Sequence, residues 1–155
     1  MNILANDGIH PAGHAALEAA GHKLWTEFIE SQNLESFINE NAIDGLLVRS
    51  ATKVRQPLID GCPHLKFIIR GGVGMDNIDV AYAREKGKEV RNTPAASSQS
   101  VAELVMGHLF SISRSLHDSN RRMPVEGVEQ FKVLKKSYGK GRELRGMTLA
   151  IVGFG

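Results

Sequence analysis

Short apolar runs alternate with stretches of helical spacing through the first 92 residues, and this alternation constrains the fold more than any other feature. Parallel strands need a crossover connection between them, which is usually a helix. Alternation of this kind therefore predicts an α/β fold built on a parallel sheet. The five expected strands lie at residues 1–5, 22–27, 43–48, 65–69 and 88–91.

The chain changes character after these strands. Residues 92–99 are small and polar and contain a proline, which cannot continue a strand ladder. Ser100 and Glu103 fit a capping box, and apolar residues follow them at helical spacing. We therefore expect a first domain over residues 1–92 and a second domain, opening with a long helix, over residues 93–155.

The last residues of the sequence have the pattern of a nucleotide-binding strand. Residues 120–138 are charged and irregular, which favours a surface excursion. The apolar run TLAIV, at 148–152, then leads directly into Gly153 and Gly155, as a strand leads into the Gly-x-Gly-x-x-Gly loop of dinucleotide-binding proteins. Only the first half of that loop is in the sequence, so the pattern predicts the beginning of such a site.

Composition excludes several classes of function. The formal net charge is +2 and basic residues occur at most in pairs, so we expect no nucleic-acid partner. No apolar run approaches the length of a membrane span and no signal peptide is recognisable, so we expect no membrane partner and a cytoplasmic location. The single cysteine, Cys62, fits a reducing compartment. The histidines lack partners at ligand spacing, so we expect no metal site.

The sequence RGGVGMDNID, at residues 70–79, is the most informative candidate site. It follows an expected strand, at the edge of the sheet where open parallel sheets bind ligands. Gly71, Gly72 and Gly74 allow backbone amides to approach a ligand closely, and successive amides favour anions. The alternative is a tight turn between a strand and a helix, and glycine content alone does not separate the two interpretations.

Arg49 follows the apolar run 43–48 and is expected at the same edge of the sheet. Its guanidinium can bind a carboxylate or a phosphate through two parallel hydrogen bonds. The alternative is a solvated arginine, with Ser50 or Thr52 capping the next helix. Taken together with the glycines, Arg49 favours an anion site. No Ser-His-Asp or Cys-His arrangement is recognisable, so we expect no catalytic residue in this chain.

Four segments, in this order, resemble those of the NAD-dependent D-2-hydroxyacid dehydrogenase family. They cover nearly the whole chain, and they are most similar to the segments of family members that act on 3-phosphoglycerate. The segments are LLVRSATKV at 46–54, RGGVGMDNID at 70–79, NTPAASSQSVAEL at 92–104 and GMTLAIVGFG at 146–155.

The resemblance implies a flavodoxin-like substrate domain followed by the incomplete start of a Rossmann nucleotide domain. It implies that amides around Gly72 and Val73 hold the substrate carboxylate, and that Val73 lies near the nicotinamide. The substrate-binding residues that it implies are Arg49, Ser50, Arg70, Gly72, Val73 and Gly74. The NAD-binding residues that it implies are Val73, Ser100, Gly153 and Gly155.

The implied reaction is the oxidation of 3-phosphoglycerate to 3-phosphohydroxypyruvate with NAD, the entry step to serine, by a homodimeric enzyme. In the family the catalytic arginine, histidine and glutamate lie beyond the pyrophosphate loop. We therefore expect an inactive N-terminal fragment that also lacks the return segment of its substrate domain. Two alternatives stay open: a dehydrogenase of glycerate, glyoxylate or lactate, and a non-catalytic flavodoxin-like module that keeps only the anion site.

Overall fold

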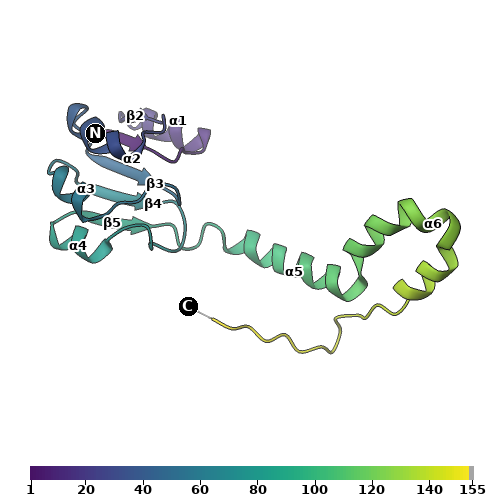
Figure 1. Cartoon of the computed structure of the whole chain (residues 1–155). Helices are drawn as coiled ribbons and strands as arrows, with labels where there is room; N and C mark the ends of the chain where they lie inside the picture. Colours follow the sequence, from purple (N-terminus) through teal and green to yellow (C-terminus); the bar gives the residue numbers. More distant parts are fainter. Residues whose placement is uncertain (154–155) are drawn as a thin grey trace. The chain divides into compact units, whose positions relative to one another are not determined.

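The computed structural model describes residues 1–153 of the chain (Figure 1). It divides into two compact units, one over Met1–Ser97 and one that begins at Ser98, and each is described by itself. None of the helices in the described part of the chain combines the length and the apolar character that crossing a membrane requires.

A five-stranded sheet forms the centre of the first unit, and all its strands run parallel in the order β2-β1-β3-β4-β5. This is the strand order of flavodoxin-like sheets, so the expected fold class is confirmed for this unit. The strands are β1 (Asn2–Ala5), β2 (Lys23–Trp25), β3 (Gly45–Val48), β4 (Phe67–Arg70) and β5 (Glu89–Asn92). The helices are α1 (Pro11–Ala19), α2 (Ser31–Glu40), α3 (Gln56–Gly61) and α4 (Val80–Glu85).

The two faces of this sheet are covered unequally. Strand order reverses direction after β2, and because parallel crossovers are right-handed, α1 lies on the face opposite α2, α3 and α4. The three helices bury the hydrophobic core, where Leu46 and Ile68 are fully inaccessible (Figure 1). On the other face Leu47 and Ile69 are only half-buried, and α1 contributes no buried residue. The core therefore lies almost entirely on one side of the sheet.

Lys88 is the one charged residue buried in the described chain. Its ammonium donates hydrogen bonds to the carbonyls of Cys62, at 2.7 Å, and Leu65, at 2.9 Å. Burial lowers the pKa of Lys88, and burial also raises the pKa of the Cys62 thiol to about 11. The lysine thus closes the turn between α3 and β4 by donating to two of its carbonyls, one of which, that of Cys62, also accepts the amide of Leu65 at 3.3 Å.

The second unit contains two helices, α5 (Ser98–Arg114) and α6 (Leu116–Tyr138), joined at Ser115 in a left-handed conformation with φ of 52°. The expectation that residues 120–138 are irregular is therefore wrong. Charged residues at a spacing of four explain the helix, because Arg122 pairs with both Asp118 and Glu126 along it.

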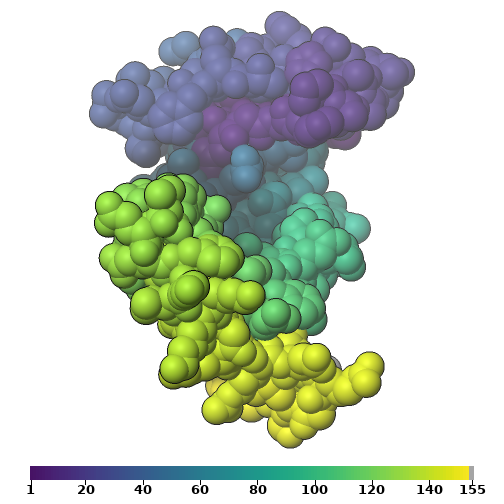
Figure 2. All heavy atoms as spheres, turned by 90° about the vertical axis from the view of Figure 1, so that its right-hand side faces the viewer, coloured from purple at the N-terminus to yellow at the C-terminus, as the bar shows by residue number. Residues whose placement is uncertain are grey.

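The strand expected at residues 148–152 is also absent, since these residues are extended without a strand partner. A strand needs a neighbour for its backbone hydrogen bonds, and an apolar run alone does not supply one. Figure 2 shows this last stretch, in yellow, protruding from the second unit. Nor does the capping box form: α5 begins before Ser100, and Glu103 accepts a hydrogen bond from Gln99 at 2.8 Å.

The unequal cover of the sheet can be tested with two neighbouring isoleucines. Ile68→Ala is expected to lower the free energy of unfolding by about 2–5 kcal/mol, because it leaves a cavity beneath the helices. Ile69→Ala, on the half-buried face, is expected to cost clearly less. Urea unfolding of both variants measures the difference, and equal losses would show that both faces are equally well covered.

Candidate functional site

The loop that follows β3, residues 49–52, wraps around the carboxylate of Asp7. One carboxylate oxygen accepts hydrogen bonds from the amides of Arg49, at 2.6 Å, and Thr52, at 3.1 Å, and the other accepts the Thr52 hydroxyl. Burial raises the pKa of Asp7, but the hydrogen bonds from Thr52, Arg49 and Ala51 outweigh it and hold the pKa below its usual value. An internal anion therefore already occupies the backbone amides of this loop.

Asn77 holds the same loop from the opposite side. Its buried side chain donates to the carbonyls of Arg49, at 2.9 Å, and Thr52, at 2.7 Å. The Arg49 carbonyl also accepts a hydrogen bond from Nε of Arg70, at 3.3 Å. Asp7 accepts hydrogen bonds from the amides of residues 49 and 52, and Asn77 donates to the carbonyls of the same two residues. The main chain that carries the Arg49 side chain is therefore held by both its donor and its acceptor groups.

The glycine loop that follows β4 is joined to the end of β5. Gly72 donates its amide to the hydroxyl of Thr93, at 2.9 Å, and accepts the amide of Thr93 at 3.1 Å. The side chain of Asn92 donates to the carbonyl of Val73. Within residues 1–153, the amides of Val73 and Gly74 have no acceptor in the chain. The loop therefore presents two open amides, whereas the Gly72 amide is already occupied.

Gly72 is favoured at its position by its backbone conformation, because its φ of 154° lies in a region that side chains rarely adopt. An added Cβ would also lie 2.7 Å from Nη1 of Arg70, which is the end of a flexible side chain and can move aside. The guanidinium of Arg70 thus crosses the loop where a side chain would otherwise be. The carboxylate of Asp76 and the guanidinium of Arg70 both border Gly74.

Neither Arg49 nor Arg70 forms an ion pair within the part of the chain that the structure describes. Both arginines lie at the carboxyl ends of neighbouring strands, β3 and β4, and Nε of Arg70 donates a hydrogen bond to the main-chain carbonyl of Arg49. Two guanidinium groups without carboxylate partners, next to open amides, are suited to binding an anion with more than one charged group.

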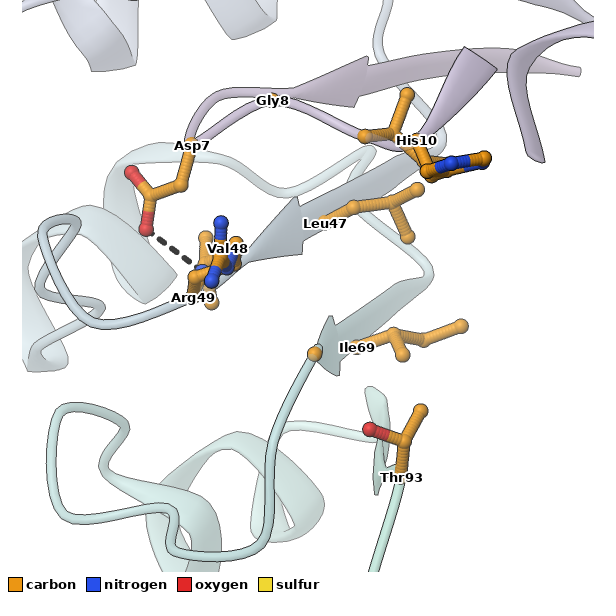
Figure 3. A pocket seen from close by; sticks show the side chains of 10 residues that line it. Asp7, Gly8, His10, Leu47, Val48, Arg49, Ile69 and Thr93 are labelled. Carbon is orange, nitrogen blue, oxygen red and sulfur yellow. Dashed lines mark hydrogen bonds between the residues drawn. The ribbon is translucent and has the colours of Figure 1, made fainter. Parts of the chain in front are cut away.

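A pocket of about 660 Å³ lies at the same carboxyl edge of the sheet (Figure 3). Figure 3 shows Leu47 and Ile69 projecting into it from neighbouring strands, with Arg49 and Thr93 at its border. Of the predicted site residues, only Arg49 lines this pocket. The pocket therefore lies beside the glycine loop and not within it. Its lining residues are Asp7, Gly8, Ile9, His10, Leu47, Val48, Arg49, Ile69, Gly71 and Thr93.

The predicted substrate-binding residues lie together in the first unit, at one edge of its sheet, and their roles stay predictions. They are Arg49, Ser50, Arg70, Gly72, Val73 and Gly74. Of the predicted NAD-binding residues, Val73 lies in the first unit, Ser100 and Gly153 belong to the second, and Gly155 lies outside the described residues.

The alternative in which Ser50 or Thr52 caps the next helix does not agree with the structure. Arg55 occupies the N-cap of α3, and the carboxylate of Asp79 accepts the amide of Gln56 at 3.0 Å. Thr52 instead faces Asp7. The capping role is therefore wrong, whereas the anion site and a solvated Arg49 both stay open as interpretations of the exposed guanidinium.

Sequence reasoning missed Asp7, Asn77 and Thr93. Asp7 and Thr93 each lie two residues beyond the end of an expected strand, and this position brings a side chain to the carboxyl edge. Asn77 is buried although amides are mostly exposed, and a polar residue inside the glycine-rich motif was the available signal.

Comparisons with known proteins identify relatives of the chain. The model of the D-isomer specific 2-hydroxyacid dehydrogenase family, catalytic domain, matches residues 3–151. A hydroxypyruvate reductase of Thermotoga maritima is 45% identical over 130 residues, which cover 84% of this chain and 40% of that protein. A D-3-phosphoglycerate dehydrogenase of Methanocaldococcus jannaschii is 38% identical over 156 aligned positions, which cover 100% of this chain and 28% of that protein. The chain thus spans less than half the length of these relatives.

Solved structures share the fold. The cofactor(NAD+)-bound 3-phosphoglycerate dehydrogenase of Entamoeba histolytica matches with a TM-score of 0.60 and 28% identity, over 74% of this chain and 39% of that one. The TT0316 protein of Thermus thermophilus matches with a TM-score of 0.72 over 81% of this chain and 41% of that one. At 21% identity, this second likeness concerns the fold alone.

Asp7→Asn tests whether the internal anion holds the site together. Because the pKa of Asp7 is lower in the folded state, its hydrogen bonds stabilise the fold above the unfolded pKa of about 3.9, and this contribution is lost as the pH falls through the folded pKa. Asp7→Asn is therefore expected to lower the free energy of unfolding by about 1.5–3 kcal/mol at neutral pH.

The difference between the two proteins is expected to shrink as the pH falls below about 4, because the unfolded chain then binds a proton at Asp7 before the folded chain does, and to vanish below the lowered pKa of the folded state. Denaturant unfolding at several pH values measures it. Asp76→Asn is the matched control, because this exposed carboxylate forms no ion pair in residues 1–153. A difference that stays constant down to pH 3 would contradict a role for the charge of Asp7.

Proposed function

The chain belongs to the family of D-isomer specific 2-hydroxyacid dehydrogenases, and we propose that it supplies the substrate-binding part of an NAD-dependent enzyme that oxidises 3-phosphoglycerate. The observation that carries this proposal is the pair of guanidinium groups, Arg49 and Arg70, beside the open amides of Val73 and Gly74. The proposed substrate carries a carboxylate and a phosphate, and the site offers donors for both.

In this proposal the open amides of Val73 and Gly74 hold the carboxylate, and Arg49 binds the phosphate. Amide groups in sequence form a concave anion site, whereas a guanidinium matches two phosphate oxygens at once. Arg70, oriented by its bond to the Arg49 carbonyl, lies between them. Ser50 is exposed on the same loop and completes the proposed substrate-binding set.

The described residues do not by themselves fit a dinucleotide. A pyrophosphate loop needs a strand before it and a helix after it, and residues 147–153 form neither. The proposal is that NAD serves the enzyme as a whole, with residues 1–92 as the substrate domain and residues 93–155 as the start of the nucleotide domain. The 155-residue chain alone is expected to be inactive.

A smaller substrate is the second candidate. The relative from Thermotoga maritima named as a hydroxypyruvate reductase is 45% identical, against 38% for the D-3-phosphoglycerate dehydrogenase of Methanocaldococcus jannaschii. Hydroxypyruvate and glycerate have a carboxylate but no phosphate, so they would use the amides without Arg49. A module that binds anions without catalysis is the third candidate. The response of Arg49 variants separates the first two candidates.

Arg49→Ala tests the phosphate role. In the 155-residue chain, binding of 3-phosphoglycerate is expected to weaken roughly 10- to 150-fold, because a hydrogen bond to a charged group is lost. Binding of glycerate is expected to change little. Titrations followed by backbone amide shifts in NMR spectra measure both constants, and an assay of NADH production with the same chain is expected to give no turnover.

Lys53→Ala is the control, since it removes an exposed cation from the same stretch without touching the guanidinium. Equal losses for 3-phosphoglycerate and glycerate in Arg49→Ala would assign Arg49 to the carboxylate and favour the smaller substrate. Turnover by the chain alone would refute the proposed absence of catalytic residues.

We also propose that the chain forms a homodimer through α5. The apolar side chains of this helix are exposed, and Ile112 is 78% accessible. Burying a large aliphatic side chain is worth about 1.5–3 kcal/mol, and a two-fold contact would cover the same face on both copies. The exposed side chains of this face and its end are Val101, Leu104, Val105, Ile112 and Leu116.

Light scattering coupled to size exclusion is expected to give the mass of two chains. Leu104→Glu combined with Ile112→Glu is expected to give one, because a charge cannot be buried in an apolar contact without a partner. Phe28→Glu, an exposed apolar position of the first unit, serves as the control. A wild-type monomer that proteases cut between residues 98 and 138 would contradict the dimer.

A further inference from the structure

We propose that the hydroxyl of Thr93 donates a hydrogen bond to the bound anion and is a substrate-binding residue of this site. The inference deepens the proposed function and rests on it. It concerns a residue that lies in the segment 92–104 but is not among the predicted site residues, and it assigns a donor in place of the Gly72 amide.

The Gly72 amide is not free to receive a ligand. The Gly72 nitrogen lies 2.9 Å from the hydroxyl oxygen of Thr93 and 3.0 Å from the carbonyl oxygen of Arg70, and it donates to both. A carboxylate could take this donor only by breaking an existing contact. Another group has to take the place of the Gly72 amide as a donor to the substrate. The Thr93 hydroxyl, which accepts the hydrogen bond of that amide, is the nearest candidate.

The hydroxyl of Thr93 still has its own proton to donate. A hydroxyl has one donor and two acceptor lone pairs, and the bond from Gly72 uses an acceptor. In residues 1–153 no acceptor is found for the Thr93 proton, and the side chain is exposed. The donor is thus available at the surface from which a ligand would approach.

Two features make this hydroxyl a better donor than an isolated threonine. A hydroxyl that accepts a hydrogen bond is polarised and donates more strongly in turn. The reciprocal bond from the Thr93 amide to the Gly72 carbonyl, at 3.1 Å, fixes the backbone that carries the side chain. The dipole of the Gly72 amide is thereby passed on to the ligand through Thr93.

The position of Thr93 agrees with the other proposed donors. It lines the pocket that Arg49 also borders (Figure 3), and its contact residue Gly72 immediately precedes the open amides of Val73 and Gly74. The ligand chemistry that fits this set is a carboxylate or a phosphate on a small hydroxy acid or oxo acid.

Thr93→Val removes the hydroxyl and keeps the shape of the side chain. In the 155-residue chain, the dissociation constant for 3-phosphoglycerate, from the amide shifts of Val73 and Gly74, is expected to rise about tenfold, which corresponds to about 1.4 kcal/mol. Thr93→Ser, which retains the hydroxyl, is expected to stay within about twofold of the wild type. Thermal unfolding of each variant checks that the fold is retained.

Thr26→Val is the matched control. Thr26 is exposed and directly follows β2, so it lies at the same carboxyl edge but at the opposite end of the strand order. This variant is expected to bind 3-phosphoglycerate as the wild type does. A loss in Thr93→Val but not in Thr26→Val or Thr93→Ser supports the proposal.

Unchanged binding by Thr93→Val overturns the inference and leaves the proposed function standing. Tighter binding also overturns it, because the hydroxyl would then compete with the ligand for the Gly72 amide. If the wild-type chain binds neither 3-phosphoglycerate, glycerate nor glyoxylate, the proposed function fails and the inference fails with it.

Discussion

A single carboxylate organises the carboxyl edge of the sheet. Asp7 collects the amides of Arg49 and Thr52 and the Thr52 hydroxyl, so the loop after β3 folds around a charge that belongs to the chain itself. Asn77 completes the arrangement by donating hydrogen bonds to the carbonyls of Arg49 and Thr52 in the same loop. The direction of Arg49, and through its carbonyl that of Arg70, depends on these contacts. The loop after β3 is therefore held by backbone polar groups that are satisfied within the chain, and the open amides of the neighbouring glycine loop are left for a ligand.

Much of the first unit could be predicted because its signals are local. Each strand is an apolar run and each helix has apolar spacing, and neither needs knowledge of the rest of the chain. Predictions failed where the structure of a segment depends on the segments that pack against it. The run at 148–152 has the composition of a strand but no strand beside it, and α6 carries ion pairs such as Arg122 with Glu126 along its length. Buried Lys88 is equally invisible in sequence, because its partners are two main-chain carbonyls.

The same distinction applies to the site. Arg49 and the glycines were predictable because their places at strand ends follow from the order of elements. The hydrogen-bond partners of these groups were not predictable, because Asp7 bonds to Thr52 across 45 residues of sequence and Gly72 bonds to Thr93 across 21. Glycine content predicted an exposed amide at Gly72, and only the folded chain reveals that Thr93 occupies it.

The strand order also has a consequence for how the chain assembles. After β3, the strands β4 and β5 each pair with the strand made just before them, so the sheet gains these strands at one edge in the order of synthesis. Contacts between consecutive elements form fast, because the intervening loop is short. The reciprocal bonds between Gly72 and Thr93 join the last two strands of this series. A ribosome therefore releases the residues that complete the anion loop after the rest of the sheet, and the site matures last.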